Sequence, residues 1–494
     1  MQAVAALAAG AALTCAFAPF GWWPLAVLCP AALLWLWQAA APRRAAWLGF
    51  CFGGGHFAAG TWWLYISIHD MADAPVWLAL LLVALLVVIM ALYYALLGAL
   101  VARLLPAAGA WRLLAGAPAL WLLIEWLRGW LFTGFPWLSL GYGFTDTWLA
   151  GWAPVVGVYG LSAWALCAGG AIVLLVLRTQ RRAALAASVT LALLAAAAPW
   201  PGRHEWTHAQ GAAVSVAVVQ GATPQNIKWQ SGNREAIRDT YARLNAEALG
   251  ARLVVWPEAA IPQLAELMPE FLARTFRAAN LHGSDVVMGV LRLGRNDEVY
   301  NSVLALTAPV AFYDKRHLVP YSEYFPVPDF VRRLLQRLNL PYSDISRGRE
   351  DQPPLRAGGL ELAPTVCYED AFGNAQRRLS AASDALLNVT NDAWFGHSPA
   401  RYQHFQMSRL RAIEAQRYLI RAANDGVSAV VGPRGEVLVQ AREYEEAVMG
   451  GTVRARRGLT PYLRVGDWPL LAAAAAALAL AALKRRRELK YNAH

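Results

Sequence analysis

The chain has 494 residues, of which 57% are hydrophobic and only 16% are charged. This composition excludes a single soluble globule of ordinary make-up and indicates a membrane protein. The formal net charge of +11 is typical of nucleic-acid partners, but much of the basic excess lies in short loops between apolar segments and in the C-terminal tail. We therefore interpret the charge as a membrane-topology signal and expect no nucleic-acid partner.

Apolar residues are concentrated in residues 1–200 and again in 468–483, whereas 203–465 has the mixed composition of a globular domain. A helix needs roughly 20 mostly apolar residues to cross a bilayer. The sequence therefore predicts a domain of seven transmembrane helices over 1–200, an eighth helix over 468–483 and a basic tail over 484–494. The eight predicted helices lie near 2–18, 22–40, 45–66, 76–102, 112–131, 153–177, 183–200 and 468–483.

The positions of Lys and Arg predict the orientation of these helices. Basic residues follow every second helix, at Arg43, Arg44, Arg103, Arg112, Arg178, Arg181, Arg182 and Lys484 to Arg487. The opposite loops contain neither Lys nor Arg. Because short cytoplasmic loops are enriched in Lys and Arg, we expect both termini in the cytoplasm and residues 203–465 on the outer side of the membrane.

From residue 212 onward, short β-rich segments alternate with helical ones, which predicts a mixed α/β domain with a largely buried sheet. Strands are predicted over 212–221, 251–259, 284–293, 299–308, 310–320, 360–370 and 384–392. Helices are predicted over 233–249, 270–283 and 402–423. Residues 427–441 are predicted to form a hairpin around Pro433-Arg434-Gly435.

Cysteine usage singles out one residue of this domain. The other four cysteines lie in apolar segments, where a thiol is most often a small buried hydrophobe: Cys15, Cys29, Cys51 and Cys167. Cys367 lies in the predicted outer domain, in "LELAPTVCYED". Because exported domains usually pair their cysteines or omit them, this lone thiol suggests a chemical role.

Three potentially reactive side chains follow predicted strands: Glu258 in "LVVWPEAAIP", Lys315 in "FYDKRHLVP" and Cys367. A thiol attacks at neutral pH only with a neighbouring base or cation, which Glu258 and Lys315 could supply. A lysine near a reacting carbonyl also stabilises an oxyanion. Taken singly, such residues are more often a structural cysteine, a solvated loop glutamate and an exposed cation.

At these residues the sequence resembles the nitrilase superfamily, whose catalytic Glu, Lys and Cys lie at three strand ends in that chain order. It resembles more closely the apolipoprotein N-acyltransferase family, the membrane-embedded branch. The resemblance covers nearly the whole chain and rests on "PQNIKW", "WPEAAIP", "YNS", "YDKRHLVPYSEYFP", "CYED", "NDAWFG" and "QHFQMSRLRAIEAQR".

The resemblance implies that residues 203–465 form an αββα sandwich beside an α-helical membrane domain. It assigns Glu258 as general base, Lys315 as the oxyanion-stabilising cation and Cys367 as nucleophile. Supporting roles fall on Glu323, Tyr368 and Glu369. Substrate-binding positions fall on Trp229, Asn301 and Trp394.

The resemblance also implies the reaction. A ping-pong enzyme in the bacterial inner membrane would transfer an acyl chain from a phospholipid, typically phosphatidylethanolamine, to Cys367. It would then pass the chain to the α-amine of the diacylglyceryl-modified N-terminal cysteine of an apolipoprotein. The domain over 203–465 would lie in the periplasm, and neither a metal nor another cofactor is expected.

Two other functions are compatible with these residues. One is a membrane-tethered amidase of the nitrilase type that hydrolyses a small amide, although a soluble substrate requires no membrane helices. The other is a lipid-binding or scaffolding protein that has lost catalysis, although the presence of Glu258, Lys315 and Cys367 together disfavours it.

Two aromatic loops and one ion pair complete the expectations. The loops over 132–144 and 318–330 are rich in aromatics and in glycine or proline, which is typical of segments at a membrane surface, and the second is a candidate lipid gate. Glu125 and Arg128 are ionisable groups in a predicted membrane helix, and their spacing favours a local ion pair.

Overall fold

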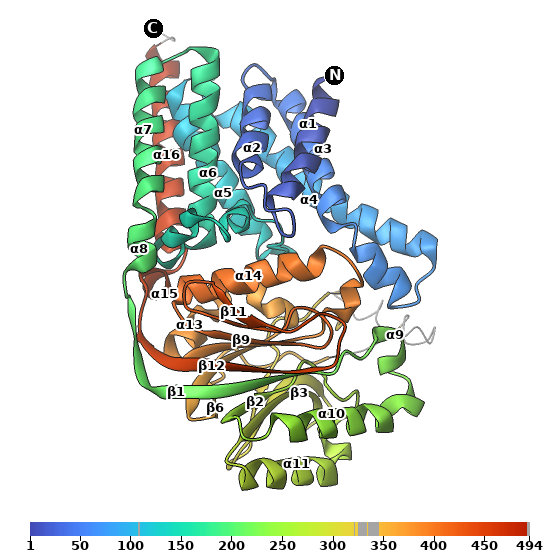
Figure 1. The fold of residues 1–494 in the computed structure, drawn as a ribbon. Helices are drawn as coiled ribbons and strands as arrows, with labels where there is room; N and C mark the ends of the chain where they lie inside the picture. Colours follow the sequence, from blue (N-terminus) through green and yellow to red (C-terminus); the bar gives the residue numbers. More distant parts are fainter. Residues whose placement is uncertain (107–108, 321, 325–332, 334–344, 492–494) are drawn as a thin grey trace. The chain divides into compact units, whose positions relative to one another are not determined.

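The contacts of the computed structural model divide the chain into two compact units, which we call the helical unit and the α/β unit (Figure 1). The helical unit comprises Met1–His204, Phe395–Glu414 and Arg464–His494, and the α/β unit comprises Glu205–Trp394 and Ala415–Leu463. The structure describes residues 1–106, 109–320, 322–324, 333 and 345–491.

The helical unit is built from apolar helices that run in sequence order through its N-terminal part. They are α1 (Gln2–Leu13), α2 (Leu25–Leu36), α3 (Pro42–Thr61), α4 (Val76–Leu104), α5 (Ala117–Arg128), α6 (Ala153–Leu177), α7 (Arg181–Ala197) and α8 (Pro199–Arg203). Two later segments complete the unit: α14 (Ala400–Ala415) and α16 (Trp468–Tyr491). The short helix α15 (Pro461–Val465) lies where the chain passes from one unit to the other.

Small residues let α3 approach its neighbours closely. A Cβ atom at Gly49 would overlap the carbonyl oxygen of Tyr94 in α4, and one at Gly10 in α1 would overlap that of Phe52 in α3. Close backbone contact at small residues is the packing mode of helices in a membrane, where lipid tails compete with large apolar side chains. The packing of α1, α3 and α4 therefore depends on glycine.

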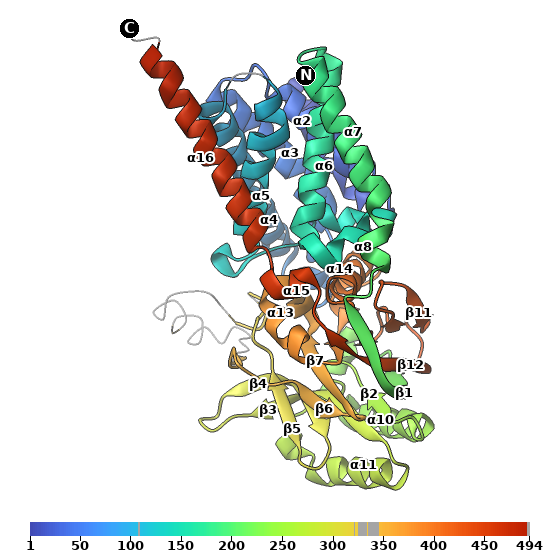
Figure 2. The same ribbon diagram turned by 90° about the vertical axis from the view of Figure 1, so that its left-hand side faces the viewer.

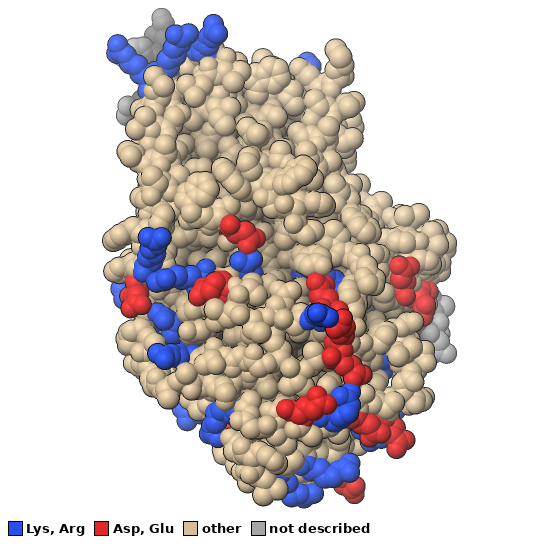
Figure 3. Space-filling model, in the orientation of Figure 1, with Lys and Arg blue, Asp and Glu red and all other residues tan. Residues whose placement is uncertain are grey.

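The helical unit fits a membrane domain by length and composition. Among the residues that the structure describes, three helical segments are long and apolar enough to cross a bilayer: Val76–Leu104, Trp148–Leu177 and Arg181–Arg203. The apolar helices Gln2–Ala16, Leu25–Leu36 and Trp468–Leu483 are shorter. On the face drawn in Figure 3, the helices of this unit carry hardly any charged side chains along their length. A helical membrane domain is thus supported, and the count of eight spans stays a prediction.

The loop over 132–144 is anchored by Glu125 and Arg128. The Glu125 carboxylate accepts a hydrogen bond from the backbone N–H of Leu140 at 2.9 Å. The Arg128 guanidinium donates to the backbone carbonyls of Phe135, at 2.5 Å, and Trp137, at 2.7 Å. Each of these side chains thus satisfies buried backbone groups of the loop, and the expected local pairing of Glu125 with Arg128 stays a prediction.

Helix α14 makes several polar contacts within the helical unit. The indole N–H of Trp137 donates to the Gln403 side chain at 2.6 Å, and the Glu414 carboxylate accepts from the backbone N–H of Val158 at 3.0 Å. Arg409 forms an ion pair with Asp146. The segment that carries α14 thus packs with the helices although β8 and β9, on either side of it in the chain, belong to the α/β unit.

The described residues of the α/β unit form two six-stranded sheets. In spatial order the first sheet consists of β12 (Ala447–Gly458), β1 (Thr207–Gln220), β2 (Leu253–Val255), β3 (Asp285–Leu293), β4 (Val299–Leu306) and β5 (Ala311–Asp314). The second consists of β11 (Val437–Gln440), β10 (Ala429–Val431), β9 (Leu419–Ala423), β8 (Ala385–Thr390), β7 (Leu360–Val366) and β6 (Leu355–Ala357). The strands β1, β2 and β3 are mutually parallel, as are β7, β8 and β9.

Helices pack on the sheets, whose central strands such as β2, β8 and β9 are fully buried. α10 (Arg234–Ala248) and α11 (Pro269–Leu281) lie side by side on the first sheet, as Figures 1 and 2 show, and α13 (Gly373–Ala382) packs on β7. In the core of this unit, Tyr241 stacks on Trp256, and Phe271 packs edge-to-face against Trp256. The predicted α/β fold of this part of the chain is confirmed.

One predicted element of this region is wrong. The helix predicted over 402–423 ends at Ala415, and Leu419–Ala423 forms strand β9. Gln416 has a φ of 46°, which takes the backbone out of the helix. β9 lies between β8 and β10 in the second sheet, and its five residues are all buried. Sheet pairing therefore overrides the helical pattern there.

Candidate active site

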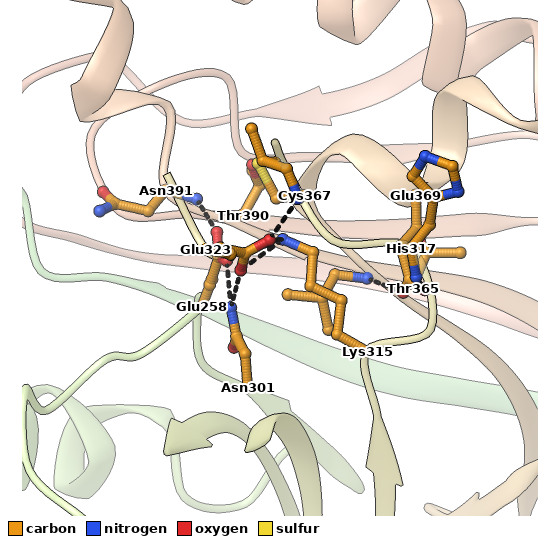
Figure 4. Close-up of polar contacts among 12 residues, drawn as sticks. Glu258, Asn301, Lys315, His317, Glu323, Thr365, Cys367, Glu369, Thr390 and Asn391 are labelled. Atoms are coloured by element: carbon orange, nitrogen blue, oxygen red, sulfur yellow. Dashed lines mark hydrogen bonds and ion pairs between the residues drawn. The ribbon is translucent and has the colours of Figure 1, made fainter. Parts of the chain in front are cut away.

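The three predicted reactive side chains lie just beyond three strand ends of the α/β unit. Glu258 follows β2 and Lys315 follows β5 in the first sheet, whereas Cys367 follows β7 in the second. Figure 4 shows the three side chains converging on one space. The Lys315 ammonium is 3.7 Å from the Glu258 carboxylate, and the charges of both groups act on the Cys367 thiol.

The Glu258 carboxylate is held from both sides. One oxygen accepts a hydrogen bond from the Asn301 amide at 2.8 Å, and the other accepts from the backbone N–H of Asn391 at 2.9 Å. The Glu258 side chain is buried, so these hydrogen bonds are shielded from water. Glu258 therefore presents its oxygens in one fixed orientation, as a general base requires.

Lys315 is a buried cation between two carboxylates. Its ammonium lies 2.8 Å from the Glu323 carboxylate, and Asn301 donates to the same Glu323 at 3.0 Å. Burial by itself would lower the pKa of Lys315, but the negative charges of Glu323 and then Glu258 outweigh it and raise the pKa above its ordinary value. Lys315 is thus positively charged across the neutral range.

Cys367 lies at a sharp turn. β7 ends at Val366, and Cys367 itself has a φ of 52°, in the left-handed region that side chains rarely adopt. Strain of this kind is typical of functional positions held by their surroundings. Burial, followed by the charge of Glu258, raises the pKa of the Cys367 thiol, while Lys315 acts in the opposite direction. The resting group is therefore a thiol and requires a base before it can attack.

Glu369 joins the turn that carries Cys367 to the segment that carries Lys315. Its buried carboxylate accepts hydrogen bonds from the backbone N–H groups of Val366 at 2.8 Å, Arg316 at 2.7 Å and His317 at 3.1 Å. Burial raises the pKa of Glu369, although these N–H groups favour its ionised form. Glu369 therefore connects the turn that carries Cys367 with the backbone that follows Lys315.

The remaining predicted site residues occupy different surroundings. Tyr368 packs edge-to-face on Phe372, with ring centroids 4.9 Å apart. Trp229 follows the short helix α9 (Gln225–Lys228) and is 45% exposed. Trp394 lies in the 3-10 turn Asp392–Phe395 and is partly buried. Asn301, in contrast, lies within the hydrogen-bonded cluster around Glu258.

The gate predicted over 318–330 falls mostly on residues 321 and 325–330, which lie outside the residues that the structure describes. Within the described ranges, no group of three or more His, Cys, Asp or Glu is arranged to hold a metal ion.

Three residues near the cluster were not singled out from the sequence. Lys228 is fully buried and donates to the backbone carbonyl of Glu258 at 3.3 Å. Burial lowers the pKa of Lys228 to about 8, although Glu258 and Asp425 favour its charged form. The others are Thr390 and Asn391, at the end of β8. The sequence could have indicated these residues only by their place beside conspicuous motifs. Lys228 directly precedes Trp229 in "NIKW", Thr390 directly precedes "NDAWFG", and Asn391 is its first residue.

Comparison with known proteins identifies relatives of both parts of the chain. Residues 9–171 match the model of the apolipoprotein N-acyltransferase N-terminal domain, and residues 215–462 match that of the carbon-nitrogen hydrolases. An apolipoprotein N-acyltransferase from Azotobacter vinelandii is 41% identical over 498 residues, covering 98% of this chain and 95% of the relative. One from Vibrio parahaemolyticus is 37% identical over 489 residues, covering 97% and 96%. A carbon-nitrogen hydrolase structure from Helicobacter pylori matches 53% of this chain and 94% of its own at 18% identity, with a TM-score of 0.36.

Proposed function

Because this chain belongs to the apolipoprotein N-acyltransferase family, we propose that it acylates apolipoproteins through a thioester on Cys367. The acyl donor is a membrane phospholipid, with phosphatidylethanolamine as the first choice. The acceptor is the α-amino group of the diacylglyceryl-modified N-terminal cysteine. The observation that carries this proposal is the convergence of Glu258, Lys315 and Cys367 from both sheets.

In the first half-reaction, the thiol attacks the ester carbonyl of the phospholipid. Glu258 takes the proton of the Cys367 thiol as the carbon–sulfur bond forms. Lys315 and the backbone N–H of Tyr368 stabilise the oxyanion of the tetrahedral intermediate. As the carbon–oxygen bond breaks, Glu258 returns the proton to the leaving alcohol, and a lysophospholipid departs.

The charges around Glu258 suit this proton transfer. Glu258, Glu323 and Lys315 together carry one net negative charge while the Cys367 thiol is neutral. Moving the thiol proton to Glu258 leaves that total unchanged, because the thiolate replaces the carboxylate charge. A buried site is penalised for a change of net charge, so a proton transfer that conserves it is favoured.

In the second half-reaction, the amine of the apolipoprotein attacks the thioester. Glu258 takes a proton from the attacking amine, and the carbon–nitrogen bond forms as the carbon–sulfur bond breaks. The proton then passes to the Cys367 thiolate and restores the resting thiol. Lys315 stabilises the oxyanion in this step also.

The helical unit explains why such a site requires a membrane domain. Each acyl CH₂ group costs about 0.8 kcal/mol to expose to water, so neither a phospholipid nor a diacylated protein leaves the bilayer readily. The reaction must therefore take place at the level of the membrane. We propose that both termini are cytoplasmic and that the α/β unit lies on the periplasmic side, as the distribution of Lys and Arg predicts.

The test is to incubate the full chain in detergent with phospholipid that carries a labelled acyl chain. Mass spectrometry of the peptide that contains Cys367 should show the added acyl group. Subsequent addition of a diacylglyceryl-modified peptide should move the label to the amine of that peptide. The matched control is Cys29→Ala, because Cys29 is a buried thiol of the helical unit and its removal should leave labelling of Cys367 unchanged.

Two results would contradict the proposal. Full transfer activity in a folded Cys367→Ala variant would exclude this thiol as nucleophile. Release of the label as free acid in the presence of the acceptor peptide would indicate a hydrolase instead, in agreement with the amidase alternative.

A further inference from the structure

A hydroxyl group that the mechanism above does not use lies beside the nucleophile. Thr390 is the last residue of β8, and its side chain is fully buried. As a hydrogen-bond partner of the sulfur, the Thr390 hydroxyl lowers the pKa of the Cys367 thiol. Figure 4 shows the two side chains next to each other. The same hydroxyl donates to a carboxylate oxygen of Asp392 at 3.0 Å, so Thr390 links the sulfur to a buried charge.

Asp392 is a fixed acceptor for this hydroxyl. Its second carboxylate oxygen accepts from the Arg421 guanidinium at 2.9 Å, and both side chains are fully buried. Arg421 also donates to the backbone carbonyl of Val427, at 3.2 Å, which holds the guanidinium in place. The backbone of Gly426 packs against the Asp392 side chain, since a Cβ atom at Gly426 would lie only 2.6 Å from it. The Asp392 side chain therefore has no room to move toward Gly426.

The single hydrogen of a hydroxyl decides how Thr390 contacts the sulfur. While Thr390 donates to Asp392, its single hydrogen is not available to Cys367, and its oxygen offers the sulfur only lone pairs. A thiolate has no hydrogen to donate and requires a donor. Rotation of the Thr390 hydroxyl from Asp392 to the sulfur supplies that donor without breaking any covalent bond.

The charged groups around the sulfur determine what this rotation contributes. Glu258 and Asp392 disfavour the thiolate, whereas Lys315 favours it. Lys315 forms an ion pair with Glu323, and the negative charge of Glu323 partly offsets the effect of Lys315 on the sulfur. A hydroxyl hydrogen that turns to the sulfur therefore adds a favourable contact where two carboxylates oppose ionisation.

We propose that Thr390 is a further catalytic residue, whose hydroxyl hydrogen turns from Asp392 to the sulfur when Cys367 becomes a thiolate and back when the thiol or thioester forms. Asp392 and Arg421 are positioning residues for this hydroxyl. The proposal rests on the proposed role of Cys367 as nucleophile. The thiol proton still passes to Glu258, and Thr390 neither gains nor loses a proton overall.

The experiment compares the full-length Thr390→Val and Thr390→Ser variants with the unaltered chain. The pH dependence of Cys367 alkylation by iodoacetamide is followed on its peptide by mass spectrometry, together with the rate of thioester formation from phospholipid. Valine preserves the shape of threonine but removes the hydroxyl. We expect Thr390→Val to move the alkylation profile to higher pH and to slow thioester formation about tenfold to hundredfold, the effect of one hydrogen bond to a charged group. Thr390→Ser should restore most of both.

The matched control is Thr275→Val in α11, where the buried hydroxyl donates to the backbone carbonyl of Phe271 at 3.0 Å, within its own helix. It should change neither measurement. The proposal is overturned if Thr390→Val retains the alkylation profile and thioester rate of the unaltered chain, or if Thr390→Ser is as impaired as Thr390→Val. The alkylation profile reports the contact with the thiol even if acyl transfer does not use Cys367, so the two proposals fail separately.

Discussion

The backbone N–H of Arg316 donates a 2.7 Å hydrogen bond to the carboxylate of Glu369, which ties the residue after Lys315 to the turn that begins at Cys367. The same carboxylate accepts from the N–H of Val366, directly before the nucleophile. Lys315 follows a strand of the first sheet and Cys367 a strand of the second. Glu369 therefore links the segment after Lys315, which follows the first sheet, to the segment before Cys367, which belongs to the second sheet.

Replacing Glu369 by Gln should reduce acyl transfer more than it reduces stability. The glutamine NH₂ group would face backbone N–H groups that the carboxylate now accepts from. Two donors cannot bond to each other, and an unsatisfied buried donor costs about 1–3 kcal/mol. We expect thioester formation to fall by at least about tenfold with a detectable decrease in the melting temperature. The control is Glu361→Gln in β7, a glutamate that pairs with the exposed Arg356 and should leave the rate unchanged. A normal rate in Glu369→Gln would contradict the linking role.

Replacing Glu323 by Gln should shift the alkaline limit of activity to lower pH. Glu323 raises the pKa of Lys315 above its ordinary value, so the stabilising pair is fully present below the unfolded pKa of 10.5 and is lost as pH rises through the folded pKa. Without Glu323, Lys315 loses its proton at lower pH and the oxyanion loses its cation. The check is the pH profile of thioester formation, with Glu298→Gln on an exposed turn as control. An unchanged alkaline limit would exclude this role of Glu323.

Replacing Lys228 by Met should separate stability from activity. Burial lowers the pKa of Lys228 from 10.5 to about 8, so the unfolded chain binds more protons between these values and the folded state gains stability as pH rises through them. By the shift in pKa, that gain is at most roughly 3 kcal/mol. In Lys228→Met this rise should be absent and stability at neutral pH should be at least equal to that of the unaltered chain.

The same variant should lose activity, because Lys228 no longer holds the backbone carbonyl of Glu258. Thermal unfolding at neutral and alkaline pH, measured beside thioester formation, checks both parts. Lys228→Arg serves as a comparison, because the guanidinium group of arginine stays protonated and positively charged at these pH values. A Lys228→Met variant that loses stability at neutral pH would contradict the stated balance of burial and charge.

The glycine contacts of the helical unit predict a difference between two glycines of α3, Gly49 and Gly54. Gly49→Ala would place a methyl group against the carbonyl oxygen of Tyr94, whereas a Cβ atom at Gly54 meets nothing within 4 Å. We expect Gly49→Ala to destabilise the unit by about 1–3 kcal/mol and to lower the folded yield. Gly54→Ala should be neutral or slightly stabilising, because alanine favours a helix. Thermal unfolding in detergent distinguishes the two, and equal effects would refute the packing argument.

Much of the candidate site could be predicted because its residues follow recognisable strands. Glu258, Lys315 and Cys367 each come directly after a short apolar segment, and apolar segments bounded by polar residues are read reliably as buried strands. The positions of Lys228 and Thr390 could not be derived in this way. Both acquire their meaning from contacts between segments far apart in sequence, and a lysine or a threonine by itself has no pattern that reveals such a contact.

The strands and helices of the α/β unit could also be predicted from the sequence, and the prediction was wrong at one helix boundary. The pattern over 402–423 favours a helix throughout, but pairing with β8 and β10 makes Leu419–Ala423 a strand. Local sequence does not report the neighbours that a strand finds in the folded chain. For the same reason the sequence could not show that Phe395–Glu414 groups with the helices, since that depends on contacts such as the one between Gln403 and Trp137.

The grouping of α14 with the helices has a practical consequence for protein production. A fragment cut at residues 205 and 463 would keep both sheets but would also keep α14 after removing the Trp137, Val158 and Asp146 that it contacts. We therefore expect gene truncation at these two boundaries to expose the surface of α14 that contacts the helices and to give an aggregation-prone product. A usable soluble version requires redesign of the surface of α14 itself.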